Sequence, residues 1–228
     1  MLTGILLFVG TMLISLYATA KVKSTYAKYS KMRTSSGYTG AEVAANILRA
    51  AGIQDVQIAQ VEHTLADHYD PSKKRLVLST ENYHGTSPAA LGVAAHECGH
   101  AIQHKARYAP LELRMSAVGF TQIAHYLIWL PILGAFTGLI APYTGILVAA
   151  IGWGVIMLFN LVTLPVEFDA TKRAKLILDN MGFVRTQEEK TAVSKVLDSA
   201  ALTYVAAFLT SLAYFLWYLL PLLLGRRE

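Results

Sequence analysis

Three long stretches of this chain contain no Asp, Glu, Lys or Arg. They cover residues 1–20, 115–166 and 199–225, and every charged residue lies between them or in the last three positions. A membrane-spanning helix needs about 20 predominantly apolar residues. The first and last stretches therefore have the length of one span each, and the middle stretch has the length of two. The pattern predicts four membrane-spanning helices separated by two polar segments.

The middle stretch contains residues that interrupt its apolar pattern. The sequence Ala-Pro-Tyr-Thr-Gly at 141–145 is typical of a turn between two spans, and Pro131 is expected to kink the span before it. The four spans are expected at residues 1–20, 116–140, 145–165 and 201–224. The interface anchors expected for the last span are Trp217, Tyr218, Arg226 and Arg227.

The first span is expected to be a retained anchor. Ala18-Thr19-Ala20 looks like a signal-peptide cleavage site. A secretory signal, however, carries its basic residues before the apolar run, whereas here they follow it, beginning with Lys21 and Lys23. The order of basic and apolar residues therefore favours an anchor.

The polar segment 21–115 has the pattern of a small α+β domain. Thr39 and Glu42 form a capping box that opens a helix. Ser87 and Pro88 are suited to the N-cap and the first turn of another helix. The elements expected are a helix from Thr39 to Ala51, strands at 56–61 and 75–79, a turn at 67–72 between them, and a helix from Ser87 to about His104.

The polar segment 166–200 is expected to be helical. One helix continues from the third span to Asn180 and is closed by Gly182. A capping box formed by Thr186 and Glu189 opens the helix that leads into the last span. The fold class predicted is mainly α: a multi-pass membrane protein with four transmembrane helices and a small α+β domain.

The composition and charge of the chain favour a membrane protein over a soluble or nucleic-acid-binding one. The chain is 54% hydrophobic and 15% charged, compared with about 25% charged residues in an average soluble domain. Its net charge of +5 comes from Lys and Arg that mostly flank the apolar stretches, so no nucleic-acid partner is expected. Eighteen of the twenty Lys and Arg lie in segments 21–115 and 166–198. The positive-inside rule then places both segments on the cytoplasmic face of the cell membrane.

The candidate metal-binding and catalytic segment is His96-Glu97-Cys98-Gly99-His100. It is an H-E-x-x-H sequence on the helix expected to start at Ser87. Histidines four residues apart lie on one helical face and can bind the same Zn²⁺. The expected role of Glu97 is general base toward the attacking water. Cys98 is expected to pack in the helix interface, and no disulfide is possible within the chain because it contains one cysteine.

A catalytic zinc ion needs a third protein ligand. His104 is four residues beyond His100, but about 12 Å of helical rise separate it from His96, so the two cannot bind one ion. Glu167 is the preferred candidate because an even number of spans returns it to the side of the H-E-x-x-H sequence. Asp169 is the second candidate, and it points about 200° away from Glu167 around the helix.

The H-E-x-x-H sequence, the upstream Asp67-His68-Tyr69-Asp70-Pro71 and the downstream segment 164–170 resemble the YugP-type family of bacterial membrane zinc metallopeptidases. The resemblance covers nearly the whole chain. It implies a zincin-like domain in a multi-pass membrane protein, one Zn²⁺ held by His96, His100 and Glu167, and Glu97 as catalytic residue. The chain is more distantly similar to HtpX-like membrane proteases. These have an aspartate four residues after their glutamate ligand, where this chain has Thr171.

Further polar residues are candidates for supporting roles. A peptidase needs a donor to the developing oxyanion, and a carboxylate commonly orients a zinc-binding histidine. The candidates for the oxyanion donor are Tyr69, Tyr83, His84 and Arg173. The candidates for the orienting carboxylate are Asp169 and Asp67.

Two classes of function follow from these features. The first is a membrane-embedded zinc-dependent endopeptidase whose site faces the cytoplasm and whose substrates are proteins or peptides at the lipid bilayer. The second is a non-catalytic membrane scaffold or chaperone that keeps a zinc ion for structure. Glu97 favours the first, because a closed structural site has no use for a base.

Overall fold

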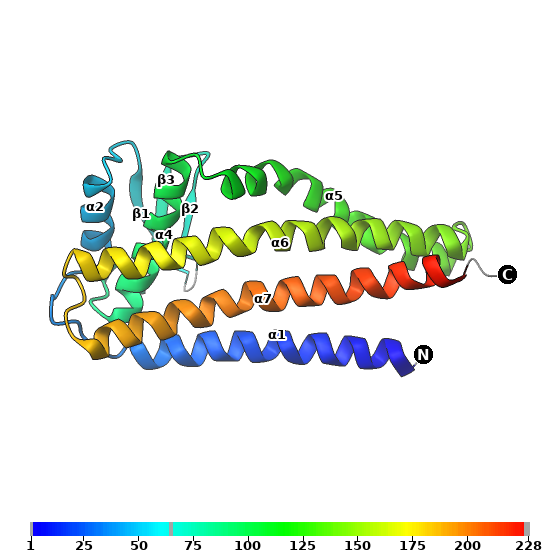
Figure 1. Cartoon of the computed structure of the whole chain (residues 1–228), viewed down its shortest axis with the longest axis horizontal. Helices are drawn as coiled ribbons and strands as arrows, with labels where there is room; N and C mark the ends of the chain where they lie inside the picture. The colour runs from blue at the N-terminus through cyan, green and yellow to red at the C-terminus, as the bar shows by residue number, and fades with distance from the viewer. Residues whose placement is uncertain (1, 64–65, 226–228) are drawn as a thin grey trace. The chain divides into compact units, whose positions relative to one another are not determined.

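The structure is a computed structural model that describes residues 2–63 and 66–225. Within these residues the chain is mainly α-helical with a three-stranded sheet (Figure 1). The helices are α1 Leu2–Tyr29, α2 Gly40–Ala50, α3 Thr80–His84, α4 Pro88–Lys105, α5 Ala109–Thr137, α6 Pro142–Asn180 and α7 Gln187–Leu224. The strands are β1 Gln57–Val61, β2 His68–Asp70 and β3 Arg75–Ser79.

The chain divides into two compact units. One unit contains α1 up to Tyr17, α5 from Glu112, α6 up to Leu164 and α7 from Thr203. The other contains residues 18–111 and 165–202, and therefore holds the sheet, α2, α3, α4 and the remaining parts of the long helices. We refer to them as the helical unit and the sheet unit.

In the part of the chain that the structure describes, α1, α6 and α7 are the helices long and apolar enough to cross a membrane. They include the expected first, third and fourth spans. The expected second span, 116–140, falls mostly within α5, which carries Gln122, His125 and Pro131 among its apolar residues. That span stays a prediction. The expected anchors Arg226 and Arg227 lie outside the described residues.

In the helical unit, polar and aromatic contacts join α6 to α7. Asn160 of α6 donates hydrogen bonds to the Ser211 hydroxyl (3.0 Å) and to a carbonyl of α7. The rings of Trp153 and Tyr214 are stacked with centroids 4.5 Å apart. An added Cβ at Gly154 would lie 3.1 Å from the ring of Phe215, so this glycine allows the two helices to approach closely.

The helix boundaries expected from capping residues are confirmed. Thr39 and Glu42 form a reciprocal capping box at the start of α2. The Ser87 hydroxyl accepts a hydrogen bond from the backbone of α4, with Pro88 in its first turn. Helix α6 ends at Asn180, and a second capping box, in which the Thr186 hydroxyl accepts from the Glu189 amide, precedes α7.

The strand order of the sheet is β1-β3-β2. Strand β3 pairs in parallel with β1, from Gln57↔Arg75 to Val61↔Ser79, and antiparallel with β2. The expected turn at 67–72 is wrong in part, because residues 68–70 form β2. The turn follows it: Asp70 accepts hydrogen bonds from the backbone of Ser72 and Lys73, so β2 and β3 form a tight hairpin.

The core of the sheet unit lies between the sheet and α2, α4, α6 and α7. The central strand β3 buries three consecutive apolar side chains. Helix α4 is buried along most of its length, and its small residues let neighbouring elements approach closely. The fully buried members of this core on α4 are Leu91, Ala94, Ala95 and Cys98. The predicted packing role of Cys98 agrees with its complete burial.

Candidate metal centre

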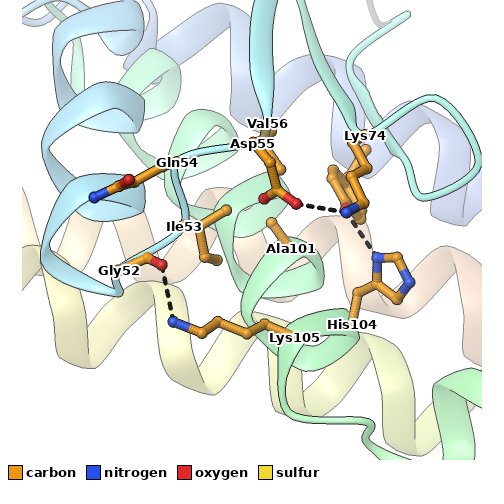
Figure 2. A pocket seen from close by; sticks show the side chains of 10 residues that line it. Gly52, Ile53, Gln54, Asp55, Val56, Lys74, Ala101, His104 and Lys105 are labelled. Atoms are coloured by element: carbon orange, nitrogen blue, oxygen red, sulfur yellow. Dashed lines mark hydrogen bonds and ion pairs between the residues drawn. The ribbon is translucent and has the colours of Figure 1, made fainter.

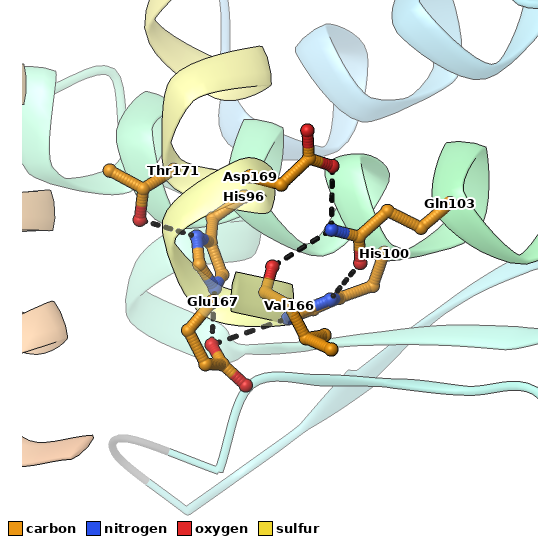
Figure 3. Close-up of polar contacts among 7 residues, drawn as sticks. All are labelled: His96, His100, Gln103, Val166, Glu167, Asp169 and Thr171. Atoms are coloured by element: carbon orange, nitrogen blue, oxygen red, sulfur yellow. Dashed lines mark hydrogen bonds and ion pairs between the residues drawn. The ribbon is translucent and has the colours of Figure 1, made fainter. Parts of the chain in front are cut away.

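Helices α4 and α6 bring His96, His100 and Glu167 together (Figure 3). One ligand atom from each residue lies within 4.8 Å of the other two. The Glu167 Oε2 atom is 3.2 Å from Nε2 of His96 and 3.6 Å from Nε2 of His100. The imidazole rings lie one helical turn apart, with their centroids separated by 4.8 Å and their planes nearly perpendicular.

These three side chains fit a tetrahedral zinc ion. Zinc–nitrogen and zinc–oxygen bonds of about 2.0–2.1 Å at tetrahedral angles separate two ligand atoms by about 3.3 Å. The Nε2–Oε2 distances of 3.2 and 3.6 Å bracket this value. Two imidazoles and one carboxylate are also the donor set of a common class of catalytic zinc site, which leaves a fourth position for water or substrate.

Small residues on both helices make the close approach possible. A Cβ added to Gly99 of α4 would lie 3.0 Å from the carbonyl oxygen and 3.1 Å from Cα of Ala170. Ala170 is itself fully buried on α6. The backbones of α4 and α6 therefore meet at Gly99 and Ala170. Gly99 lies between His96 and His100, and Ala170 is three residues after Glu167.

Gln103 fixes the orientation of His100. Its amide nitrogen donates to the Val166 carbonyl and to the Asp169 carboxylate, both at 2.8 Å. Because both amide hydrogens are used, its oxygen faces His100 and accepts from Nδ1–H at 3.0 Å. The lone pair of His100 is therefore on Nε2, which faces Glu167 and is free to bind a metal ion.

Asp169 takes part in the site indirectly. It was the alternative to Glu167 as a ligand, but its carboxylate points to Gln103 and also accepts a hydrogen bond from Arg173. The expected orienting carboxylate is thus joined to His100 through an amide. Asp67 has a different role, since it accepts hydrogen bonds from Ser79 and Asn82 at the end of β3.

His96 has a weaker partner on its other ring nitrogen. The Thr171 hydroxyl lies 3.4 Å from His96 Nδ1, four residues after Glu167. The second ring nitrogen of His96 therefore faces a hydroxyl and not a carboxylate.

The electrostatics of the site favour a cation. Burial raises the pKa of Glu167, but hydrogen bonds and the charges of His100 and His96 outweigh it and hold that pKa well below its usual range. Burial lowers the pKa of His100, but the nearby carboxylates of Glu167 and Glu97 raise it overall. Negative charge on two carboxylates therefore favours a positive charge beside the histidines.

Glu97 lies next to this cluster on the same helix. Its side chain is buried, with 8% of its surface exposed. Its carboxylate is one of the groups that raise the pKa of His100. The structure therefore places a buried carboxylate one residue after His96 on α4.

His104 and Tyr69 bond to each other instead of joining the cluster. The Tyr69 hydroxyl is 2.9 Å from His104 Nδ1, and burial raises the pKa of that tyrosine. Both line a pocket of about 450 Å³ in which Lys74 pairs with Asp55 and Lys105 donates to the Gly52 carbonyl (Figure 2). The expectation that His104 is not a ligand agrees with this contact.

The other candidates for the oxyanion donor have contacts of their own. His84 Nε2 lies 3.2 Å from the Gln60 side chain, and the ring of Tyr83 contacts that of His84 and packs on the core. Arg173 bonds Asp169. Of the four candidates, only Arg173 is linked to the cluster through a chain of described hydrogen bonds.

Sequence reasoning did not identify Gln103. The available signal was its spacing, three residues after His100 and seven after His96, which places it on the same face of α4. Its partners on α6 could not be read from the sequence, because they depend on the close approach at Gly99.

Two comparisons with known proteins bear on this site, and a third, with solved structures, found no match. The family described as "Putative neutral zinc metallopeptidase" matches residues 4–223. The "Putative membrane protease YugP" of Bacillus subtilis (strain 168) is 43% identical over 224 residues, which is 98% of each chain. Because the family match and the relative both extend over nearly the full length, this chain belongs to that zinc metallopeptidase family.

Proposed function

We propose that this protein is a membrane-embedded zinc-dependent endopeptidase, with Zn²⁺ held by His96, His100 and Glu167 and with Glu97 as general base. The observation that carries the proposal is the convergence of two Nε2 atoms and one carboxylate oxygen at zinc-ligand spacing, beside a buried carboxylate on the same helix. A bound Zn²⁺ supplies Lewis acidity that lowers the pKa of water and polarises the scissile carbonyl.

Glu97 performs the proton transfers in this mechanism. Its carboxylate accepts a proton from the attacking water and delivers it to the amine that leaves when the peptide bond breaks. Its burial strengthens this exchange because few water molecules compete for the proton. Gln103 holds His100 in the tautomer that presents Nε2, and Arg173 keeps Asp169 oriented toward Gln103.

Replacement of Glu97 tests the mechanism. Glu97→Gln keeps the size of the side chain and removes the base, so peptidase activity should fall about 100-fold or more while the zinc content is unchanged. The measurement pairs zinc analysis with cleavage of a membrane-protein substrate by the full-length protein.

The same variant separates the enzyme from a scaffold with a structural zinc ion. Peptidase activity equal to the wild type would contradict the proposed role of Glu97. Wild-type protein that binds zinc and cleaves no protein or peptide would favour the scaffold.

Four membrane spans are part of the proposal. His100 and Glu167 belong to the same compact unit, so the chain between them crosses the bilayer an even number of times. Helix α6 is one crossing, and α5 is the helix available for the other. Charge then orients the sheet unit toward the cytoplasm, since eighteen of twenty Lys and Arg lie in 21–115 and 166–198.

Cysteine labelling in intact cells tests this topology. In a Cys98→Ala background, single cysteines at Ser72 and Gln187 should be shielded from an impermeant reagent, while one at Tyr143 should react. Labelling of the Ser72 and Gln187 sites on opposite faces would contradict four spans. Labelling of both from outside would place the site on the exterior.

A further inference from the structure

A groove between α1 and α7 lies in the sheet unit, away from the metal centre. It has a volume of about 450 Å³. The α1 side carries residues spaced as on one helical face, and so does the α7 side. The lining residues on α1 are Lys21, Ser24, Thr25, Lys28 and Tyr29, and those on α7 are Lys195, Asp198, Ser199 and Leu202.

The groove carries a positive charge that the protein does not neutralise. Within residues 2–63 and 66–225, no carboxylate lies within ion-pair distance of Lys21, Lys28 or Lys195. The one acidic lining residue, Asp198, is already paired with Lys175 at 2.6 Å and accepts from Ser194. The three lysines are therefore available to an anionic ligand.

A neighbouring groove differs in how its lysines are paired. The pocket between α6 and α7 is also lined by lysines, including Lys175 and Lys190. There each of these two lysines has an acidic partner at 2.6 Å, Asp198 and Asp179 respectively. Lys195, which lines both grooves, has no acidic partner among the described residues, and the α1 side adds Lys21 and Lys28.

The groove lies at the boundary between the apolar and polar parts of α1 and α7, which is where the membrane surface is expected. Lys21 is the first charged residue after the apolar start of α1, and Asp198 is the last before the apolar part of α7. Because the two helices run in opposite directions, Lys21 and Leu202 share the membrane end of the groove. Lys28 lies about 10 Å of helical rise further out, so the lysines span the depth of the head groups.

We propose that this groove binds the phosphate of an anionic phospholipid, with Lys21, Lys28 and Lys195 as its donors and Leu202 next to the start of the acyl chains. The hydroxyls of Ser24 and Ser199 donate to carbonyls of their own helices, and the three lysines are the positively charged donors in the lining. Basic pockets between membrane helices are a known form of lipid recognition. The lipid would hold α1 against α7 where both enter the bilayer.

The test uses purified full-length protein and compares phosphatidylglycerol with phosphatidylcholine by native mass spectrometry of retained lipid. The wild type should retain phosphatidylglycerol preferentially. Each lysine near an anionic surface contributes about fivefold in affinity, so the combined replacement of all three by Gln should weaken phosphatidylglycerol binding about tenfold or more. Equal retention of both lipids by the wild type would overturn the proposal.

A matched variant separates the groove from general surface charge. It removes three exposed lysines outside the groove, through Lys23→Gln, Lys31→Gln and Lys172→Gln. Its binding should change less than about twofold. An equal loss in the two triple variants would show that charge alone, without the groove, attracts the lipid.

Two further experiments test whether the variants fold and whether the bound phosphate belongs to a lipid. Replacement of the three groove lysines by Arg should preserve binding, because Arg retains the charge and the donors. Loss of binding in this Arg variant, with helicity and thermal midpoint unchanged, would contradict lysine-to-phosphate recognition. Complete displacement of the lipid by millimolar inorganic phosphate would show that the groove binds free phosphate and would overturn the lipid assignment.

Discussion

Two sites on one face of α4 have the same histidine spacing and different surroundings. His96 and His100 are four residues apart and meet Glu167 of α6 in a buried cluster. His104 is another four residues on, but its partner is Tyr69 of β2, beside an open pocket lined by lysines. Spacing along a helix therefore aligns imidazoles without making them ligands. The element packed opposite each histidine decides whether a carboxylate completes the site.

The largest effect is expected from removal of Glu167, the carboxylate that distinguishes the two sites. Glu167→Ala removes the only acidic ligand atom among the described members of the cluster and should abolish stoichiometric zinc binding. His104→Ala should keep the zinc content of the wild type, because the histidine bonds Tyr69. Zinc per chain in the purified full-length variants is the measurement.

Asp169→Ala is the control for the charge of that region. It should lower the zinc content much less than Glu167→Ala, since Asp169 reaches the site only through Gln103. A larger loss in Asp169→Ala than in Glu167→Ala would mean that the ligand has been assigned to the wrong carboxylate.

An intermediate effect is expected from the amide that orients His100. Gln103→Leu leaves His100 Nδ1 without its acceptor, and loss of such a partner typically weakens metal affinity about 10–100-fold. Thr171→Val should weaken it less, because the hydroxyl lies 3.4 Å from His96. Zinc competition with a chromophoric chelator measures both. Equal affinity in wild type and Gln103→Leu would show that packing alone orients His100.

The smallest effect is expected at the close contact between α4 and α6, which brings Glu167 to His96 and His100 but not to His104. Gly99→Ala forces a Cβ to 3.0 Å from the Ala170 carbonyl and should destabilise the protein by about 1–3 kcal/mol, with weaker zinc binding. Gly92→Ala, on the same helix, meets side chains at 3.6–3.8 Å and should stabilise by about 0.5–1 kcal/mol. Thermal unfolding in detergent compares them. Similar midpoints in the two variants would contradict the close α4–α6 contact.

Local chemistry made much of the fold predictable. The capping boxes at Thr39 and Thr186 and the Ser87-Pro88 pair each fixed a helix start, because their hydrogen bonds join residues three apart. Strand β2 escaped prediction because three residues carry too little pattern, and its hairpin with β3 depends on a turn that begins at Asp70.

The candidate site was predictable to the extent that it depends on spacing. His96 and His100 follow from helical periodicity, and the placement of Glu167 near them followed from an even number of spans. The roles of Gln103 and Thr171 depend on how α6 crosses α4, which is set by contacts between residues more than 60 positions apart. Such long-range contacts leave no periodic trace in the sequence.

X-ray absorption spectroscopy of the zinc-loaded, full-length protein tests the central claim most directly. The account predicts one zinc ion per chain with two imidazole nitrogens and a carboxylate oxygen at about 2.0–2.1 Å, plus one further light atom. Replacement of either His96 or His100 by Ala should remove one imidazole from the spectrum or abolish binding. A zinc ion with three imidazoles or a sulfur ligand would contradict the site, because Glu167 would then not be the third protein ligand.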